Sequence, residues 1–332
     1  MPKSSNIIIK LEPAKPTKAY DTYWKFAFER QNVWYNRLRG AQRPFSDDPI
    51  LQEYKFTNVY RASDRVSQYL IKYVIYNTVY GDNPDDTVFR ILLFKLFNKI
   101  ETWRLLEHRF GELSVKTFKI NAFIKFLDSE MNKGRTLYSN AYMMASGCRE
   151  FNVTRKHHAH LMLLEKMLKE KLPDKIANCT KMRDAYALLL DYPLIGRFLA
   201  YQYVTDLNYS ELTNFKETEF TVPGPGARDG IKKCFTSLGG LSETDIIKMM
   251  TDRQEFEFER LGLKFKKLGN RKLQYIDIQN IFCEVDKYCR VAHPDLSGFS
   301  GRTRIKQRFK YNPDPIEYYF PPKWDIKLGA EK

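Results

Sequence analysis

The chain has 332 residues, and 55 Lys and Arg against 40 Asp and Glu give it a formal charge of +15. This charge favours a polyanionic partner such as a nucleic acid. No apolar run reaches the roughly 18 residues that a membrane span needs, and the five cysteines include no C-x-x-C pair for a zinc ribbon or an iron–sulfur cluster. We expect a cytoplasmic protein that needs neither a metal nor another cofactor and no obligate protein partner.

Helical periodicity dominates the chain, and alternating β patterns are few. Residues 1–16 read as an extended arm, 17–293 as a helical domain of two lobes with a cleft between them, and 294–332 as a tail rich in Pro and aromatic residues that packs on the surface. The expected helices cover residues 17–40, 60–76, 88–103, 115–131, 136–147, 154–172, 179–190, 194–207, 228–238, 243–252 and 276–290. A short strand is expected at 219–222, and 255–274 fit no pattern. The predicted fold class is mainly α with a few short strands.

Two glycine turns each precede an expected helix, one at 192–196 (YPLIG) and one at 222–226 (VPGPG). The start of a helix has free backbone N–H groups and the positive end of the helix dipole, so it can bind a phosphate. Ordinary helix-entry turns have the same composition. The predicted DNA-phosphate contacts are Gly196, Gly224, Gly226, Arg228, Lys232 and Lys233.

Several catalytic motifs are missing from the sequence. It has no P-loop, no dinucleotide-binding G-x-G-x-x-G after a strand, no G-x-S-x-G elbow and no zinc-deaminase signature. The cluster at 157–160 (HHAH) fits neither H-E-x-x-H nor a facial triad. We interpret it as a solvated basic face of a helix.

Three stretches are dense in residues that can carry chemistry, namely 56–65, 194–208 and 275–290. Arg61, Asp64 and Arg65 would share a helical face and clamp a phosphate, or form a structural ion-pair network. Asp277 would align with an amide and a carboxylate on the last helix, or would only cap it. The predicted base-binding residues are Phe56, Asn58, Tyr60, Arg61, Asp64, Arg65, Gln202, Gln279, Asn280 and Glu284.

Taken together, these stretches resemble one known family, the alpha-glutamyl/putrescinyl thymine pyrophosphorylases and 5-hydroxymethyluracil DNA kinase helical domains. The matching motifs are 56–61 (FTNVYR) with Asp64 and Arg65, 224–227 (GPGA), and 277–280 (DIQN) with Cys283, Glu284, Lys287 and Tyr288. The likeness covers most of residues 20–290.

The resemblance implies a fold like that of helix-hairpin-helix DNA glycosylases, with two helical lobes and a base pulled out of the DNA stack. The family includes a bacterial anti-phage glycosylase. This sequence lacks the P-loop of the kinase members, so kinase activity is not carried over. The glycosylase spacing from hairpin to Asp is not kept cleanly, which leaves the catalytic carboxylate open among Asp206, Glu219 and Asp277, with Asp277 slightly favoured.

The leading hypothesis is a DNA glycosylase that excises a hydroxymethylated or glycosylated pyrimidine, flipped out of double-stranded DNA, in defence against phage. The first alternative is a DNA base hypermodification transferase that acts on a 5-hydroxymethyl pyrimidine. The second is a non-catalytic DNA-binding module. Lys287 joins the three carboxylates as a candidate catalytic residue, either as an amine nucleophile or as a salt-bridge partner.

Overall fold

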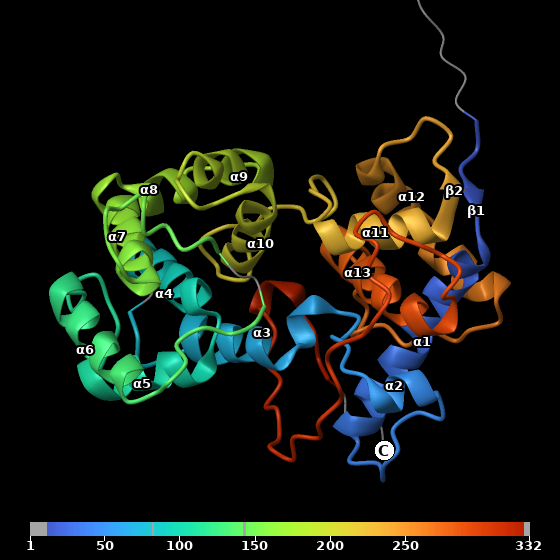
Figure 1. Cartoon of the computed structure of the whole chain (residues 1–332), viewed down its shortest axis with the longest axis horizontal. Coiled ribbons are helices and arrows are strands. Elements are labelled where there is room, and N and C mark those ends of the chain that lie inside the picture. Colours follow the sequence, from blue (N-terminus) through green and yellow to red (C-terminus); the bar gives the residue numbers. More distant parts are fainter. Residues whose placement is uncertain (1–11, 82, 142–143, 329–332) are drawn as a thin grey trace, which may run out of the picture. The chain divides into compact units, whose positions relative to one another are not determined.

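The computed structural model describes residues 12–81, 83–141 and 144–328 (Figure 1). Within these ranges the helices α1 to α13 and one two-stranded sheet confirm the prediction of a mainly α fold. The chain divides into two compact units. Unit 1 holds the described residues up to 59 together with 223–267 and 272–312, and unit 2 holds 60–222, 268–271 and 313–328.

Unit 1 is built from five helices and the sheet. They are α1 (Lys18–Leu38), α2 (Pro49–Glu53), α11 (Pro225–Cys234), α12 (Glu243–Arg260), α13 (Tyr275–Ala292), β1 (Lys15–Pro16) and β2 (Phe235–Ser237). The two strands are antiparallel, with Lys15 opposite Ser237. The end of the expected N-terminal arm is therefore part of the sheet, and residues 1–11 of that arm lie outside the described residues.

The core of unit 1 forms where α1, α11 and α13 pack together. Helix α1 buries an aromatic face made by Tyr23, Trp24 and Phe26, and the Tyr23 hydroxyl donates to the Ile278 carbonyl at 3.0 Å. At its start, Thr17 accepts a hydrogen bond from the Ala19 amide at 3.1 Å, which caps the helix.

Helices α11 and α13 approach each other closely at two glycines of α11. A Cβ on Gly226 would overlap the Sγ of Cys283, and a Cβ on Gly230 would overlap the backbone carbonyl of Phe282. Because a backbone atom cannot rotate away as a side chain can, Gly230 sets the distance between these two helices.

Unit 2 is a separate helical body. Its helices are α3 (Arg65–Tyr69), α4 (Pro84–Phe97), α5 (Ile100–Phe110), α6 (Ile120–Asn132), α7 (Lys156–Lys169), α8 (Leu172–Ala177), α9 (Met182–Leu190) and α10 (Arg197–Leu207). A 3₁₀ turn at Arg61–Ser63 precedes α3, a π-helical stretch at Leu70–Ile75 continues it, and a 3₁₀ turn at Pro322–Trp324 lies near the end of the chain.

Several predicted boundaries in unit 2 are wrong, and the backbone gives the reason. The helix expected at 88–103 is two helices, because Asn98 adopts the left-handed conformation (φ 48°) between α4 and α5. The helix expected at 154–172 ends at Lys169, and the left-handed Lys171 (φ 58°) then leads into α8, whose first turn contains Pro173.

Two further expected elements are absent from the described residues. The segment 136–147 contains no helix in its described part; the apolar side chains of Leu137 and Met144 are buried without one. Residues 219–222 form no strand. In unit 1, the unassigned stretch at 255–274 begins with the last turns of α12, which runs to Arg260 rather than to 252.

The histidine cluster is not a solvated face, which corrects the interpretation from sequence. His157 and His160 are fully buried on α7. The Tyr138 hydroxyl and His160 Nδ1 lie 3.0 Å apart, and His160 Nε2 lies 2.9 Å from the Ala145 carbonyl. Burial lowers the pKa of His160 to about 4, so it is neutral at pH 7.

Among the described residues, no helix combines the length and the apolar character that crossing a bilayer requires.

Replacing Gly230 by Ala should destabilise unit 1 by about 3 kcal/mol, because the added methyl group must displace the backbone of α13. Gly81→Ala is the matched control, since a Cβ there meets its nearest atom at an ordinary 3.7 Å. Urea denaturation followed by circular dichroism measures both variants. Equal midpoints for Gly230→Ala and the wild type would contradict the close contact between α11 and α13.

Candidate functional site

Unit 1 gathers one group of predicted site residues where the segment 56–58 lies against α13. The Thr57 amide donates to Glu284 Oε2 at 3.0 Å, and Asn280 Nδ2 donates to the Asn58 carbonyl at 2.8 Å and to Thr57 Oγ1 at 3.2 Å. Asn280 and Glu284 are four residues apart, so both project from the same face of the helix. The sequence predicted this alignment, although it did not predict that the face meets residues 56–58.

Lys287 completes this group, which we call the Thr57 cluster (Thr57, Asn280, Glu284 and Lys287). Its Nζ lies 2.7 Å from Glu284 Oε2 and 4.7 Å from the centre of the Phe56 ring. The side chains of Glu284 and Lys287 are only 8% and 15% exposed, so solvent screens their ion pair weakly. Lys287 thus has the salt-bridge geometry that we weighed against a nucleophilic role.

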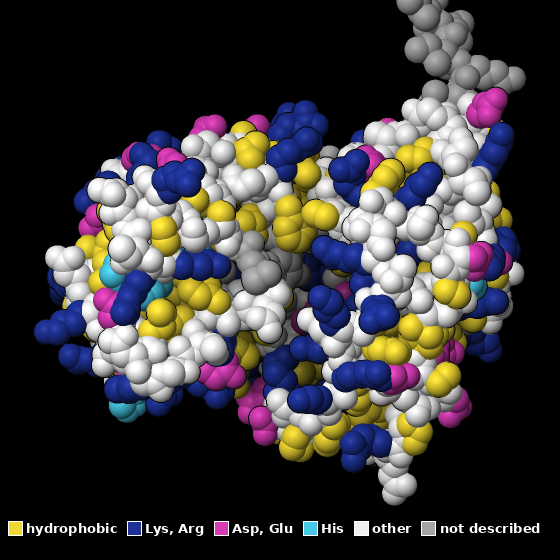
Figure 2. Space-filling model, in the orientation of Figure 1, with side chains coloured by type: hydrophobic (Ala, Val, Ile, Leu, Met, Phe, Trp, Pro, Cys, Tyr) yellow, Lys and Arg dark blue, Asp and Glu magenta, His cyan; other side chains and the backbone are white. Residues whose placement is uncertain are grey.

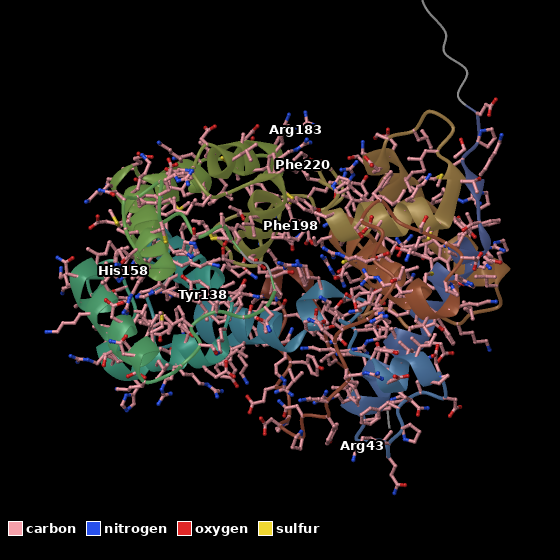
Figure 3. All side chains as sticks on the ribbon, in the orientation of Figure 1. Arg43, Tyr138, His158, Arg183, Phe198 and Phe220 are labelled. Atoms are coloured by element: carbon pink, nitrogen blue, oxygen red, sulfur yellow. The ribbon has the colours of Figure 1, made fainter. Side chains whose placement is uncertain are left out.

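Arg30 on α1 connects the segment 56–58 to a neighbouring cavity. Its Nη2 donates to Asn58 Oδ1 at 2.6 Å and contacts the Phe56 carbonyl at 3.4 Å. The cavity beside it has a volume of about 410 Å³, within the range of small-ligand pockets. Aromatic and guanidinium groups dominate its wall, with Arg30, Arg43, Phe45, Tyr54, Phe56 and Phe309 among them; Figure 3 marks Arg43 in the loop between α1 and α2.

Asp277, the favoured catalytic candidate, lies in the first turn of α13 and caps it. Its Oδ2 accepts the Gln274 amide at 3.0 Å, and the Gln274 side chain accepts in return from the backbone of Asp277. Asp277 is 4% exposed. The neighbouring Gln279 is also buried and is not part of the Thr57 cluster.

Unit 2 holds a second group of predicted residues, all buried. Arg61 donates from Nη1 to Asp206 Oδ1 and to the Tyr209 hydroxyl, both at 2.7 Å, and from Nε to Gln202 Oε1 at 3.0 Å. Lys95 Nζ lies 3.2 Å from Asp206 Oδ2. The sequence singled out Gln202 for base binding and Asp206 for catalysis, but it did not single out Lys95.

The charged side chains of this buried group shift one another's pKa. Burial alone would raise the pKa of Asp206, but Arg61 and Lys95 outweigh it and hold the pKa of this carboxyl below its ordinary value. Burial lowers the pKa of Lys95, and Asp206 opposes that shift. Asp206 therefore stays ionised at pH 7 and serves as an internal counter-ion.

The remaining predicted residues of unit 2 do not join one constellation. Tyr60 is 2% exposed and its hydroxyl donates to the Arg271 carbonyl at 2.6 Å. Arg61, Asp64 and Arg65 do not share a helical face, because Asp64 has extended backbone between the 3₁₀ turn and α3. Arg65 Nη2 donates to the Asp314 carbonyl at 2.7 Å, and Glu219 is an exposed partner of Lys216 at 3.7 Å.

The two glycine turns open helices as expected. Gly196 is the N-cap of α10 and Gly224 is the N-cap of α11, and neither helix has a side-chain cap. Lys233 does not fit a phosphate contact, because its side chain is 1% exposed and its Nζ lies 2.9 Å from Asp286 Oδ1. The two other predicted cations are exposed: Arg228 and Lys232 lie 5.5 and 5.9 Å from the centre of the Phe299 ring.

Sequence reasoning missed a strongly basic surface in unit 1. Arg302, Arg304, Lys306, Arg308 and Lys310 alternate with other residues along an exposed, non-helical stretch, which we call the basic segment (residues 302–310). Figure 2 shows Lys and Arg side chains gathered over α13 and the chain that follows it. The alternation is visible in the sequence, and it was overlooked because the tail was judged by its Pro and aromatic content.

Backbone hydrogen bonds hold the basic segment in place. The Lys55 amide donates to the Gln307 carbonyl at 3.0 Å, and the Phe309 amide donates to the Glu53 carbonyl at 2.9 Å. Arg290 Nη1 on α13 donates to the Arg304 carbonyl at 3.1 Å. The segment is therefore a fixed part of unit 1, adjacent to the cavity that Phe309 lines.

The model of the family described as "5-hmdU DNA kinase, helical domain" matches residues 17–298. The chain belongs to this family. A member of similar sequence, the 5-hmdU DNA kinase of Bacillus phage SP10, is 26% identical over 338 residues, which cover 95% of this chain and 52% of the relative. The helical-domain chain thus spans about half the length of the curated relative that it matches, and no solved structure matches it.

The match confirms the resemblance that we drew from the motifs. It includes both glycine turns, the Thr57 cluster and the Arg61–Asp206 pair, and it stops just before Phe299 and the basic segment.

Asp206→Asn should destabilise unit 2 by about 3–5 kcal/mol at pH 7, because it leaves two buried cations without their counter-ion. The pKa of Asp206 is lower in the folded chain than in the unfolded one, so its contribution is complete above about pH 4 and is lost as the pH falls through the folded pKa. The difference between variant and wild type should therefore shrink below pH 4. Urea titrations from pH 2.5 to pH 7 test this, and a difference independent of pH would contradict it.

Proposed function

We propose that this chain acts in DNA base hypermodification. It binds DNA and holds a 5-hydroxymethylated pyrimidine while the hydroxymethyl oxygen receives a further group, and the glycosidic bond stays intact. Membership of the 5-hmdU DNA kinase helical-domain family carries this proposal, because the relative from phage SP10 is named for action on that modified nucleotide.

Glu284 is the residue that we assign to the hydroxymethyl group. Both of the contacts described for its carboxylate, from the Thr57 amide and from Lys287, are to Oε2. These contacts fix the carboxylate plane, and Oε1 is then the atom that accepts the hydroxymethyl O–H. Lys287 pairs with this carboxylate at 2.7 Å, and a charged acceptor binds a hydroxyl more strongly than a neutral one does.

The 410 Å³ cavity is the place that we propose for the base. Glu284 is not a lining residue itself, but Phe56 in the cavity wall lies 4.7 Å from Lys287 Nζ, which pairs with Glu284, so we place the base at the Phe56 side of the cavity. Phe45, Tyr54 and Phe309 are aromatic rings of the cavity wall on which a pyrimidine can stack. Stacking of one base on an aromatic ring contributes about 1–3 kcal/mol to the free energy of binding.

The basic segment and the pair Arg228 and Lys232 are the proposed contacts to the DNA backbone. All of these cations are exposed, and the segment is anchored by its backbone. Arg228 and Arg308 already pair with Glu243 and Glu53, so Arg304, Lys306, Lys310 and Lys232 are the first candidates for phosphate contacts. The exposed Phe299 ring lies between these two groups in the sequence, and aromatic side chains next to cations are typical of nucleic-acid-binding surfaces.

The glycosylase hypothesis has less support than this one. It needs a carboxylate that faces the sugar, whereas Asp206 is buried between two cations, Asp277 caps α13 and Glu219 is on the surface beside Lys216.

The first test is discrimination between bases. A duplex with one 5-hydroxymethyluracil should bind about tenfold to 100-fold more tightly than the same duplex with thymine, as one hydrogen bond to a charged group is worth about 1.5–3 kcal/mol. Glu284→Gln should lose most of this preference and keep its affinity for the thymine duplex. Fluorescence anisotropy measures both affinities, and Glu255→Gln, an exposed carboxylate on α12 paired with Lys267 and Lys272, is the control.

Two outcomes would contradict the proposal. Equal affinity for the two duplexes would favour a DNA-binding module without base selectivity. Alkali-labile abasic sites in the hydroxymethylated duplex would favour the glycosylase, whereas nucleoside mass spectrometry that finds the base still attached to its sugar supports hypermodification.

A second test concerns the basic segment. Replacing Arg304 and Lys306 by Ala should weaken binding of both duplexes equally and reduce the slope of log affinity against log salt by up to about two, since each lost phosphate contact removes about 0.9. The control replaces Lys166 and Lys169, exposed lysines on α7 that pair with Glu170 and Glu165. A salt dependence unchanged in the Arg304 and Lys306 variant would exclude this segment from the interface.

A further inference from the structure

Three metal-binding side chains converge in unit 2 where α6 meets α7. Asp128 comes from α6, and His157 and His158 come from the first turn of α7. Both imidazoles use Nε2, which lies 2.9 Å from Asp128 Oδ1 in His157 and 3.0 Å in His158. Figure 3 shows His158 between these two helices.

The contacts at Asp128 are crowded in a way that hydrogen bonding alone does not explain. Three nitrogens approach Oδ1, since Arg155 Nη1 is there too, at 2.6 Å. A carboxylate oxygen has two lone pairs, so one oxygen cannot accept all three donors well. Oδ2, by contrast, has one described contact, with His158 at 3.1 Å.

A metal ion resolves this crowding. One ligand atom from each of the three residues can be chosen so that all lie within 4.8 Å of one another. Zinc binds imidazole nitrogen and carboxylate oxygen at about 2.0–2.2 Å, so tetrahedral ligand atoms lie about 3.3–3.6 Å apart. His158 Nε2 lies 3.1 Å from Asp128 Oδ2, within a few tenths of an ångström of that spacing.

The surroundings of these three residues suit a metal ion with one coordination position left for water. The His157 side chain is 1% exposed, whereas those of His158 and Asp128 are 20% and 28% exposed. The site is therefore closed on the side of the protein and open to a water molecule on the other, as in zinc sites with three protein ligands.

We propose that Asp128, His157 and His158 bind a divalent transition-metal ion of the zinc class. Asp128 binds through Oδ2, and Arg155 stays on Oδ1 as an outer partner that orients the carboxylate. The ion fastens α6 to α7. Inspection of the sequence missed this site because it considered ligands from one helix only, whereas the carboxylate comes from another helix 29 residues earlier.

The experiment uses the full chain without a histidine tag, stripped with a chelator and titrated with Zn²⁺ by calorimetry. We expect one ion per chain with a dissociation constant at or below the micromolar range, and a Zn²⁺-dependent rise in Tm. Co²⁺ in place of Zn²⁺ should give the visible absorption of a four-coordinate site. Asp128→Asn, which keeps the side-chain volume, and His158→Ala, at a partly exposed position, should each weaken binding at least tenfold.

The control is His108→Ala, which removes an exposed histidine on α5 and should leave Zn²⁺ binding unchanged. Circular dichroism checks that each variant is folded, and His158→Ala decides the outcome if Asp128→Asn does not fold. Wild-type protein that binds no Zn²⁺, or a folded His158→Ala that binds it as tightly as the wild type, would overturn the proposal and leave Asp128 as a hydrogen-bonded link between the helices.

Discussion

The close approach of α11 to α13 is the constraint on which the site in unit 1 depends. Because Gly230 has no side chain, the backbone of α11 lies against the Phe282 carbonyl, and Gly226 makes room for Cys283 in the same way. The neighbouring face of α13 is then directed at residues 56–58, where Glu284 and Asn280 bind the backbone and side chain of Thr57. A larger residue at position 230 would move the carboxylate that we assign to the substrate.

The sequence predicted the local features of the fold better than it predicted which residues meet. The two glycine turns precede helices as expected, with Gly196 and Gly224 as the N-caps, and Ser242 and Asp245 form a capping box at the start of α12. These features depend on a few neighbouring residues. The left-handed backbone of Asn98 was not predictable in this way, because the apolar pattern continues across it.

The candidate site shows the limit of reading motifs along a chain. The stretch 56–65 looked like one constellation, but the boundary between the two compact units falls between Val59 and Tyr60. Phe56 and Asn58 therefore belong with α13, whereas Arg61 belongs with Asp206 in the interior of unit 2. A motif that is continuous in sequence can thus serve two separate bodies, and only three-dimensional contacts reveal the division.

The alternation of cations in the basic segment has a consequence for selectivity. Where a chain is extended, side chains two residues apart point the same way and lie about 6.6 Å from each other, so cations that alternate in sequence can line up as a row. Such a row attracts the charge of the sugar–phosphate chain, which repeats regardless of which bases are present. A protein that holds DNA in this way can slide along the duplex. It recognises a single altered nucleotide, by shape and hydrogen bonding, only where that nucleotide reaches the cavity that Phe309 lines.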